Sequence, residues 1–291
     1  MSVAEASTST PTALVSVDWA REHLEDPKVR FIEVDVDTAA YDTGHLPGAV
    51  GFNWKTQLTD GVRRDLVSRE ELQALLRQAG VDDDTTIVLY GDNNNWFAAW
   101  AYWQLRYHRI DNVKLLDGGR VKIEAAGLPL TTDAPSHAPG SITVPEGTRE
   151  ELRAYRDEVI AAAADGSTGL VDVRSPEEFR GELAAPAHLP QEAAQRRGHI
   201  PGAANVPWGT AVAEDGTFKP IDQLREIYGG KGITPDREIV AYCRIGERSS
   251  HTWFVLSELL GYPNVRNYDG SWTEYGSLVG VPIETGTGQA T

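Results

Sequence analysis

The chain contains an internal repeat, and this repeat restricts the folds that are open to it. Residues 45–49 (HLPGA) recur roughly 150 residues later as residues 199–203 (HIPGA). Two further segments recur in the same order with similar spacing: 87–90 (IVLY) at 239–242 (IVAY), and 113–119 (VKLLDGG) at 265–271 (VRNYDGS). A solenoid has a far shorter period. The 291 residues are therefore predicted to form two copies of one domain.

Each copy alternates short apolar strands with helical patterns. Residues 31–35 and 170–174 are predicted to be buried strands, as are residues 86–90 and 238–242. The aromatic residues Trp96, Trp100, Trp103 and Tyr107 follow one another at helical spacing and predict one apolar helix face. Alternating strands and helices indicate an α/β fold, in which a mainly parallel sheet is flanked by helices on both faces.

Composition shifts along the chain suggest the domain boundaries. We expect a flexible tail at 1–13, a first domain at 14–130, a linker rich in Pro, Ser, Thr and Gly at 131–145, a second domain at 146–285 and a short tail at 286–291. A helix over 148–163 is predicted to open the second domain. Residues 183–197 have no counterpart in the first copy, so we expect a surface insertion there.

Charge and cysteine content narrow the classes of partner. With 43 acidic and 27 basic residues, the net charge of −16 disfavours nucleic acid and anionic membranes as partners. One cysteine excludes an internal disulfide and a cysteine-rich metal cluster, and the seven histidines lack ligand spacing, so we expect neither metal nor cofactor. The N-terminus resembles no secretory signal, which favours a cytoplasmic location.

The only cysteine, Cys243, follows the predicted strand 239–242 and precedes a predicted helix at 251–260. It is thus expected at the carboxyl end of a parallel strand, the edge at which α/β folds bind ligands. In the loop between, Gly246 permits a left-handed turn, and Ser249 or Ser250 is expected to cap the helix.

The same loop favours negative charge on sulfur. Its backbone N–H groups can curl inward around Cys243, and the two guanidinium groups of Arg244 and Arg248 add positive charge. The sequence therefore predicts a loop that is exposed and holds a thiolate, or the terminal sulfur of a persulfide, without a histidine base.

Several motifs carry a resemblance to a known family. They are the Cys-Arg-x-Gly loop at 243–246, the His-x-Pro-Gly-Ala turn of both copies, the segment 172–179 (DVRSPEEF) and the ending 268–272 (YDGSW). With these motifs, residues from about 14 to 283 resemble the rhodanese family, and most of all the tandem-domain thiosulfate sulfurtransferases of actinobacterial type.

The resemblance implies a reaction. Cys243 would take the outer sulfur of thiosulfate, a small anionic donor, and pass it from a persulfide to a thiophilic acceptor such as cyanide or a thiol. A protein acceptor is a further option. In such tandem proteins only the C-terminal domain is catalytic. Here the repeat places Gly91 at the position of Cys243 and Asp92 at that of Arg244, so the first domain is expected to be inert and to supply one wall of the cleft.

The resemblance also suggests roles for the neighbouring residues. Arg244 and Arg248 are expected to bind the sulfonate oxygens of the donor. The substrate-binding loop is completed by Ile245, Gly246 and Glu247, and structural support is expected from Asp172, Arg174 and Ser249, with Asp172 steadying the loop and Arg174 forming an ion pair. Glu178 stands where many tandem members have a basic residue, which leaves the loop arginines as the main anion binders.

The histidines and aromatic residues are judged by their presence in the inert copy. His45 and His199 occupy the same turn in both copies, so an architectural role is expected for both. By resemblance, Trp96 and Phe97 would line the cleft opposite Cys243, whereas Trp100 and Trp103 are assigned to core packing.

Three alternative functions remain open from the sequence. A sulfurtransferase using 3-mercaptopyruvate tends to have a small uncharged residue where this chain has Arg244. A rhodanese-fold cysteine phosphatase has five residues between its cysteine and arginine, whereas only four separate Cys243 from Arg248. A persulfide delivery module acting on a protein partner is the third alternative.

Overall fold

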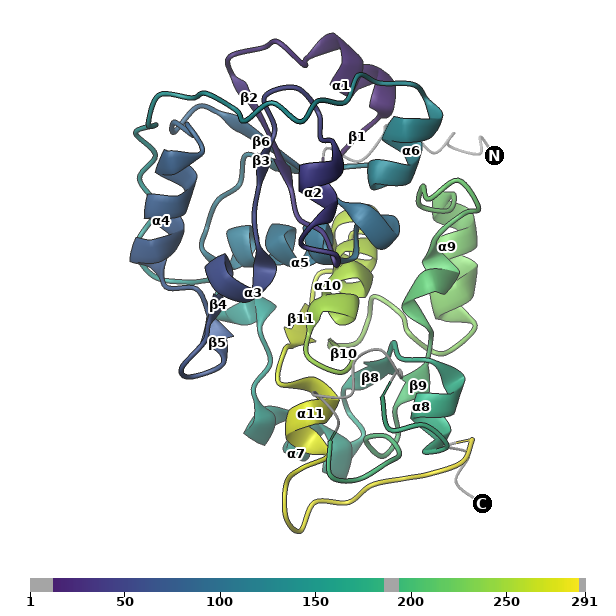
Figure 1. Cartoon of the computed structure of the whole chain (residues 1–291). Coiled ribbons are helices and arrows are strands. Elements are labelled where there is room, and N and C mark those ends of the chain that lie inside the picture. Colours follow the sequence, from purple (N-terminus) through teal and green to yellow (C-terminus); the bar gives the residue numbers. More distant parts are fainter. Residues whose placement is uncertain (1–12, 186–193, 288–291) are drawn as a thin grey trace, which may run out of the picture.

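The computed structural model of the chain describes residues 13–185 and 194–287, and these form two α/β domains one above the other in Figure 1. The first domain contains a parallel sheet with the strand order β1-β7-β6-β2-β3. Its strands are β1 (Leu14–Val15), β2 (Val29–Glu33), β3 (Val50–Gly51), β6 (Thr86–Tyr90) and β7 (Val113–Leu116). Its helices are α1 (Val17–Glu22), α2 (Ala40–Thr43), α3 (Trp54–Gln57), α4 (Arg69–Gln78), α5 (Asp92–Tyr107) and α6 (Gly119–Ala125).

The second domain repeats this plan. Its parallel sheet has the order β11-β10-β8-β9, with β8 (Gly169–Asp172), β9 (Ala204–Asn205), β10 (Ile239–Tyr242) and β11 (Val265–Tyr268). Its helices are α7 (Arg156–Asp165), α8 (Pro176–Arg180), α9 (Ile221–Gly229), α10 (Glu247–Phe254) and α11 (Ser271–Tyr275), with the 3-10 turns η1 (Glu150–Leu152) and η3 (Trp208–Ala211). The predicted α/β fold with parallel sheets is confirmed.

Alternation along the strands explains why helices cover both faces of each sheet. Successive strand residues point to opposite faces. On β6, Ile87 and Leu89 belong to the apolar cluster that includes α4 and α5, whereas Val88 and Tyr90 belong to the cluster that includes α1 and α6. Each sheet is thus buried on both sides, as its near-continuous apolar strands require.

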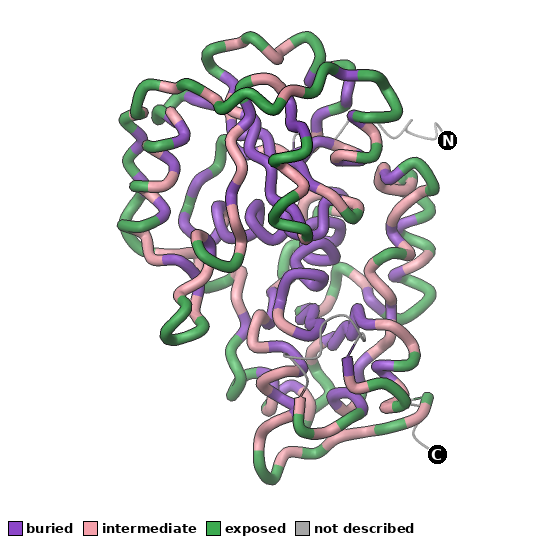
Figure 2. The backbone as a smooth tube through the Cα atoms, in the orientation of Figure 1, coloured by how far each residue is buried: buried purple, intermediate pink, exposed green. Residues whose placement is uncertain are grey.

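The two domains share one apolar core. Helices α5 and α10 pack against each other where the domains meet, and Figure 2 shows both helices buried at the centre of the molecule. The ring of Tyr102 on α5 meets that of Phe254 on α10 edge to face, with 4.8 Å between the centroids. A single cluster of buried side chains includes residues of both domains.

Some predicted boundaries change. The predicted helix over 148–163 is broken into η1 and α7, because Arg153 between them is extended and bridges in parallel to Asn267 of β11. The predicted helix over 251–260 begins earlier, at Glu247, and widens into a π-helix, η4 (Val255–Leu259). Most of the proposed tails and part of the proposed insertion lie outside the described residues, but Ala13, assigned to the first tail, is buried in the core.

The predicted linker over 131–145 packs along the first domain. The ring of His137 contacts the carbonyl of Gly48 at 2.7 Å, and the backbone N–H of Ser141 donates to Asp82 at 2.7 Å. The side chain of Val144 is completely buried. This segment therefore fixes the point at which the chain enters the second domain.

The turn histidines have equivalent surroundings in the two copies. His45 stacks on Tyr41 and bonds its carbonyl at 3.0 Å, and His199 stacks on Phe179 and bonds its carbonyl at 2.7 Å. Both rings are buried within their own turns. This matches the architectural role expected for both.

Candidate functional site

Cys243 directly follows β10, a central strand of the second sheet, and its loop leads into α10. Gly246 ends the loop in a left-handed conformation with φ of 103°. A Cβ atom at this position would lie 2.6 Å from the Cα atom of Asp269. Only glycine combines this backbone conformation with so close an approach. The loop therefore depends on both the turn and its contact with the segment after β11.

A backbone donor lies within hydrogen-bond distance of the sulfur. The N–H of Gly246 points at Sγ of Cys243 with 3.1 Å between nitrogen and sulfur. The hydroxyl of Ser249 lies 3.6 Å from the sulfur, but the same oxygen is only 2.6 Å from Oδ1 of Asn267. Because a hydroxyl has one proton, the shorter contact takes it. The amide is thus the donor that favours an anionic sulfur.

The segment after β11 clamps the backbone of the cysteine loop. Oγ of Ser271 accepts the N–H of Cys243 at 3.0 Å, and its own proton goes to the carbonyl of Tyr268 at 2.6 Å. The N–H of Trp272 donates to the carbonyl of Cys243 at 3.1 Å. Ser271 and Asn267 were not assigned to the site from sequence. The motif at 268–272 was the available signal for Ser271.

The helix cap differs from the prediction. Residue Gly246 is the N-cap of α10, so Ser249 and Ser250 lie inside the helix and do not cap it. The hydroxyl of Ser250 donates to the carbonyl of Gly246 at 2.8 Å. The hydroxyl of Ser249 donates to Asn267, whose own amide donates to the same carbonyl at 3.1 Å, so Ser249 reaches the loop through Asn267.

A carboxylate lies next to the sulfur. Oε2 of Glu247 is 3.6 Å from Sγ of Cys243, and Oε1 is 3.8 Å from Nη2 of Arg244. All three side chains are buried. The charge of Arg244 near the sulfur is therefore offset by the adjacent carboxylate.

Arg248 is also paired, which corrects the expectation that it offers a free guanidinium fork to a donor. Its terminal nitrogens contact the two oxygens of Glu178 at 2.9 and 3.1 Å, and both residues are buried. Burial alone would favour the neutral form of Glu178, but the hydrogen bonds and charge of Arg248 outweigh it, and its pKa lies below the usual value. The two loop arginines thus face two carboxylates.

The cysteine loop is enclosed, which corrects the expectation of an exposed loop. Cys243 has no exposed surface, and Arg244 and Arg248 are at most 5% exposed. A small cavity of about 90 Å³ reaches the loop from outside. Its lining comes from both domains: Trp54, Thr59, Arg64, Asp65, Leu66, Phe97, Trp100, Ile245, Glu247 and Asp269. The lining includes Ile245 and Glu247 of the cysteine loop but not Cys243 itself.

The aromatic wall differs in detail from the prediction. Phe97 lines the cavity as expected, and Trp100, which was assigned to core packing, lines it too. Trp96 instead lies against Arg248, with 5.7 Å between the guanidinium carbon and the ring centroid. Trp54 on α3 stacks on Phe97 with 4.3 Å between centroids and completes the wall. The sequence pattern places Trp96, Phe97 and Trp100 on one helix, α5, but does not indicate which of their rings face the other domain.

Asp172 and Arg174 bind each other at the end of β8. Nε of Arg174 is 3.0 Å from the nearer carboxylate oxygen of Asp172, and both residues are fully buried. The guanidinium also donates to the carbonyl of Gly198 at 2.8 Å. The carboxylate of Asp172 thus holds Arg174 and the turn at 198–202 rather than the cysteine loop itself. The ion pair expected for Arg174 is present.

The equivalent loop of the first domain is built differently. A Cβ atom on Gly91 would lie 2.1 Å from the carbonyl oxygen of Val34. Asp92 accepts the backbone N–H groups of Val36 and Asp37 at 2.6 and 3.1 Å, and the next three residues, 93–95, are asparagines with left-handed backbones. This loop has no nucleophile at the position of Cys243, and the inertness of the first domain stays a prediction.

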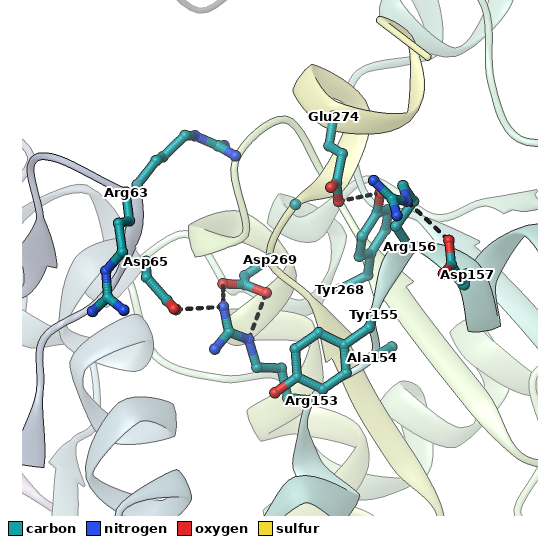
Figure 3. A pocket seen from close by; sticks show the side chains of 12 residues that line it. Arg63, Asp65, Arg153, Ala154, Tyr155, Arg156, Asp157, Tyr268, Asp269 and Glu274 are labelled. Carbon is teal, nitrogen blue, oxygen red and sulfur yellow. Dashed lines mark hydrogen bonds and ion pairs between the residues drawn. The ribbon is translucent and has the colours of Figure 1, made fainter. Parts of the chain in front are cut away.

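A larger cavity of about 430 Å³ lies at the mouth of the cleft, and Figure 3 shows its side chains. It shares Arg64, Asp65 and Asp269 with the small cavity. Arg153 lies between the two domains here and contacts Asp65 at 2.9 Å and Asp269 at 2.8 Å (Figure 3). Its guanidinium stacks over the ring of Tyr155. The mouth is thus rich in charged side chains of both signs.

The described ranges contain neither a candidate metal site nor a candidate membrane span. No group of three or more His, Cys, Asp or Glu side chains in residues 13–185 and 194–287 is arranged to hold a metal ion. Within the same residues, no helix is both long and apolar enough to cross a bilayer.

The chain is similar to known proteins over almost its full length. The Rhodanese-like domain family matches residues 16–126 and 155–278. A protein of Saccharopolyspora erythraea named "Putative thiosulfate sulfurtransferase" is 58% identical over 95% of this chain and 97% of its own length. A Thermus thermophilus protein named "Sulfur carrier protein TtuD" is 56% identical over 95% of this chain and 98% of its own.

Solved structures agree with this assignment. The structure of the 3-mercaptopyruvate sulfotransferase SseA from Escherichia coli aligns with a TM-score of 0.77 at 29% identity, and covers 90% of this chain and 99% of that one. The anaerobic ergothioneine biosynthesis enzyme from Chlorobium limicola aligns with a TM-score of 0.79 at 26% identity, over 94% of this chain and 70% of that one. The resemblance drawn from the motifs is confirmed, and the chain is a tandem-domain member of the rhodanese-like family.

Proposed function

We propose that this protein is a thiosulfate sulfurtransferase in which Cys243 carries the transferred sulfur. The observation that carries the proposal is the contact of the Gly246 N–H with the cysteine sulfur at 3.1 Å, at the carboxyl end of β10. An amide aimed at a sulfur stabilises negative charge on it, as both a thiolate and a persulfide anion require. The names of relatives that are more than half identical support thiosulfate as the donor.

The proposed reaction has two half-reactions. In the first, the thiolate of Cys243 attacks the outer sulfur of thiosulfate and forms a sulfur–sulfur bond. The bond between the two sulfurs of thiosulfate breaks, and sulfite leaves with the electron pair. In the second, an acceptor such as cyanide attacks the terminal sulfur, becomes thiocyanate, and returns the thiolate. Charge is conserved in each step, and neither step needs an oxidant or a reductant.

The surrounding residues have distinct proposed roles. The amide of Gly246 stabilises the anionic sulfur, with Ser271 and the Ser249–Asn267 pair holding the loop in shape. Ile245 and Glu247 form the end of the cavity through which the donor must pass. Arg244 and Arg248 contribute positive charge behind the sulfur rather than open anion sites, because each faces a carboxylate.

The pairing of Arg248 with Glu178 favours sulfur transfer over phosphatase activity. A phosphatase of this fold would need the guanidinium of Arg248 to hold phosphate oxygens, and here both of its terminal nitrogens face Glu178. The small cavity of about 90 Å³ has the volume of about three liquid waters, which suits a small donor.

Arg244 and the names of relatives bear on the choice between thiosulfate and 3-mercaptopyruvate. An arginine follows the cysteine here, where enzymes that use 3-mercaptopyruvate tend to have a small uncharged residue. The bacterial structure at 29% identity is that of a 3-mercaptopyruvate sulfotransferase, whereas two relatives at 58% and 57% identity are named for thiosulfate. The acceptor in the cell is proposed to be a thiol or a protein, since a close relative is named a sulfur carrier protein. A reducing cytoplasm would keep the lone thiol of Cys243 free between turnovers.

The carrier step is tested by intact-protein mass spectrometry. Incubation of the purified protein with thiosulfate is expected to add the mass of one sulfur atom, and cyanide is expected to remove it as thiocyanate. Cys243→Ser should keep the fold and gain no mass. Sulfur uptake by the Cys243→Ser variant, or no uptake by the wild-type protein, would overturn the proposal. Turnover measured with both donors then ranks thiosulfate against 3-mercaptopyruvate.

A further inference from the structure

The β4–β5 hairpin of the first domain carries an unusual backbone position at Arg64. The hairpin comprises β4 (Thr59–Asp60) and β5 (Asp65–Leu66), and the side chain of Asp60 organises its turn by accepting the N–H groups of Val62 and Arg63 at 2.9 and 3.1 Å. Arg64 closes the turn with a left-handed φ of 57°. Glycine or asparagine takes this conformation more readily than arginine does. An arginine here therefore suggests a use for its side chain.

The position of Arg64 in the cleft points to that use. It is a residue that lines both the large cavity at the mouth and the small cavity that ends at Ile245 and Glu247 of the cysteine loop. A molecule that moves from solvent toward the sulfur through these cavities passes this side chain. Arg64 itself is exposed, so its guanidinium can meet a ligand without first being uncovered.

Its charge is also uncompensated, unlike that of the neighbouring arginines. Arg63 pairs with Asp60 at 2.7 Å, and Arg156 pairs with Asp157 at 2.9 Å. Arg153 is held by two carboxylates. Across residues 13–185 and 194–287, no carboxylate forms an ion pair with Arg64. It is thus a free cation at the entrance to the cavities.

We infer that Arg64 is a substrate-binding residue that captures the anionic sulfur donor at the mouth of the cleft and guides it toward Cys243. This inference rests on the proposed function and extends it, because it assigns part of donor recognition to the catalytically inert domain. The net charge of −16 repels anions at long range, so a dianion such as thiosulfate needs a local cation. The loop arginines already face Glu247 and Glu178, and Arg64 supplies that cation.

The inference predicts a specific kinetic pattern. Arg64→Ala is expected to raise the KM for thiosulfate roughly tenfold with little change in kcat, because one charge-assisted contact is lost at a distance from the sulfur. Added salt should then affect the KM of the variant less than that of the wild-type protein. Release of thiocyanate from the preformed persulfide should be unchanged at neutral pH, where hydrogen cyanide is mainly uncharged. Arg64→Lys should give an intermediate KM.

Two variants separate binding from structure. Arg63→Ala removes the same charge from the adjacent position of the same hairpin, and its KM should stay close to that of the wild-type protein. Arg64→Gly removes the side chain and also relieves the left-handed strain. It should therefore raise the KM as much as Arg64→Ala does, while the melting temperature stays the same or increases.

The outcomes distinguish a failure of the proposed function from a failure of the inference about Arg64. If the wild-type protein forms no persulfide from thiosulfate, the proposed function fails. If the wild-type protein is active and both Arg64→Ala and Arg64→Gly keep its KM, the inference about Arg64 fails alone. An equal rise in KM for Arg63→Ala would also overturn the inference, because the effect would then reflect the general field of the hairpin.

Discussion

The chemistry of the site depends on individual charges that are buried beside the sulfur. Two arginines and two glutamates surround Cys243, so the enclosed loop has no large net charge of its own. Breaking one such buried pair leaves an uncompensated charge, which is far more costly than losing an exposed ion pair. The pairs therefore fix the shape of the loop, and the backbone amide of Gly246 remains the group directed at the sulfur.

A buried histidine makes the folded state sensitive to acid. His251 on α10 is completely buried against the rings of Trp208 and Phe218, and its two ring nitrogens have no hydrogen-bond partner among the described residues. Burial lowers its pKa from 6.5 to about 3. The unfolded chain thus binds a proton that the folded chain does not, and stability is lost as pH falls below 6.5.

His251→Phe should remove this dependence. By linkage, the histidine costs about 2 kcal/mol of stability at pH 5 relative to neutral pH, and phenylalanine cannot take up the proton. Urea unfolding at pH 7.5 and at pH 5 measures the difference. The variant should lose less stability than the wild-type protein on acidification. Equal losses for the two proteins would show that His251 is not buried in the neutral form.

Sequence reasoning at this scale placed Cys243, the proposed nucleophile, at the end of a strand, but it did not identify the side chains around it. Cys243 and Gly246 are three residues apart in the chain, and a strand, a short loop and a helix place them without knowledge of the rest. The pairing of Arg248 with Glu178 joins residues that are distant in sequence, so no local pattern indicates it. No local pattern indicates Arg64 either, because its proposed role depends on a cavity lined by residues of both domains.

At the scale of elements, the β4–β5 hairpin is attached to the second domain through Arg153. This side chain contacts Asp65 on β5 and Asp269 after β11, so it joins the hairpin to the segment that clamps the cysteine loop (Figure 3). Burial disfavours the charged guanidinium, but the two carboxylates outweigh burial and raise its pKa. The position of the hairpin, and with it the mouth of the cleft, depends on this arginine.

Arg153→Met should therefore lower the free energy of unfolding by about 3 kcal/mol, because two carboxylates are left facing each other without a cation. Arg156→Met is the matched control, since its ion pair with Asp157 is exposed and contributes little. Urea denaturation followed by tryptophan fluorescence compares the two variants. A similar small loss in both would mean that the Arg153 ion pairs contribute no more than a surface contact.

The repeat allowed the strands to be predicted well, because buried strands leave a short apolar run in each copy. The hairpin had no such signal, since β4 and β5 contain two residues each and their turn lies on the surface. The break between η1 and α7 also escaped prediction. It arises because Arg153 pairs with β11 and the linked carboxylates, a tertiary interaction that overrides the local helical pattern.

At the scale of the whole molecule, the two domains are one folding unit. The cluster of buried side chains that includes α5 and α10 continues from the first sheet to the second. Separating the domains would expose this apolar surface to water, at a cost proportional to its area. The repeat predicted two domains, but the shared core follows from aromatic helix faces whose partners the sequence does not identify.

The separated halves should therefore be unstable. Residues 146–291 produced alone are expected to lack cooperative unfolding and to take up no sulfur, although they contain Cys243 and its loop. The intact chain should show a single calorimetric transition. Circular dichroism and calorimetry on the fragment and on the intact chain provide the test. A fragment that melts sharply and forms the persulfide would contradict a shared core.

The construction of the first loop makes the asymmetry between the copies hard to reverse. A side chain at Gly91 would collide with the carbonyl of Val34, and the left-handed asparagines that follow coil the backbone away from the path that the cysteine loop takes. Exchanging Gly91 for cysteine would hence not create a second loop like that of Cys243. If Cys243 carries sulfur as proposed, each polypeptide then has one such centre, and a second centre has to come from a second molecule.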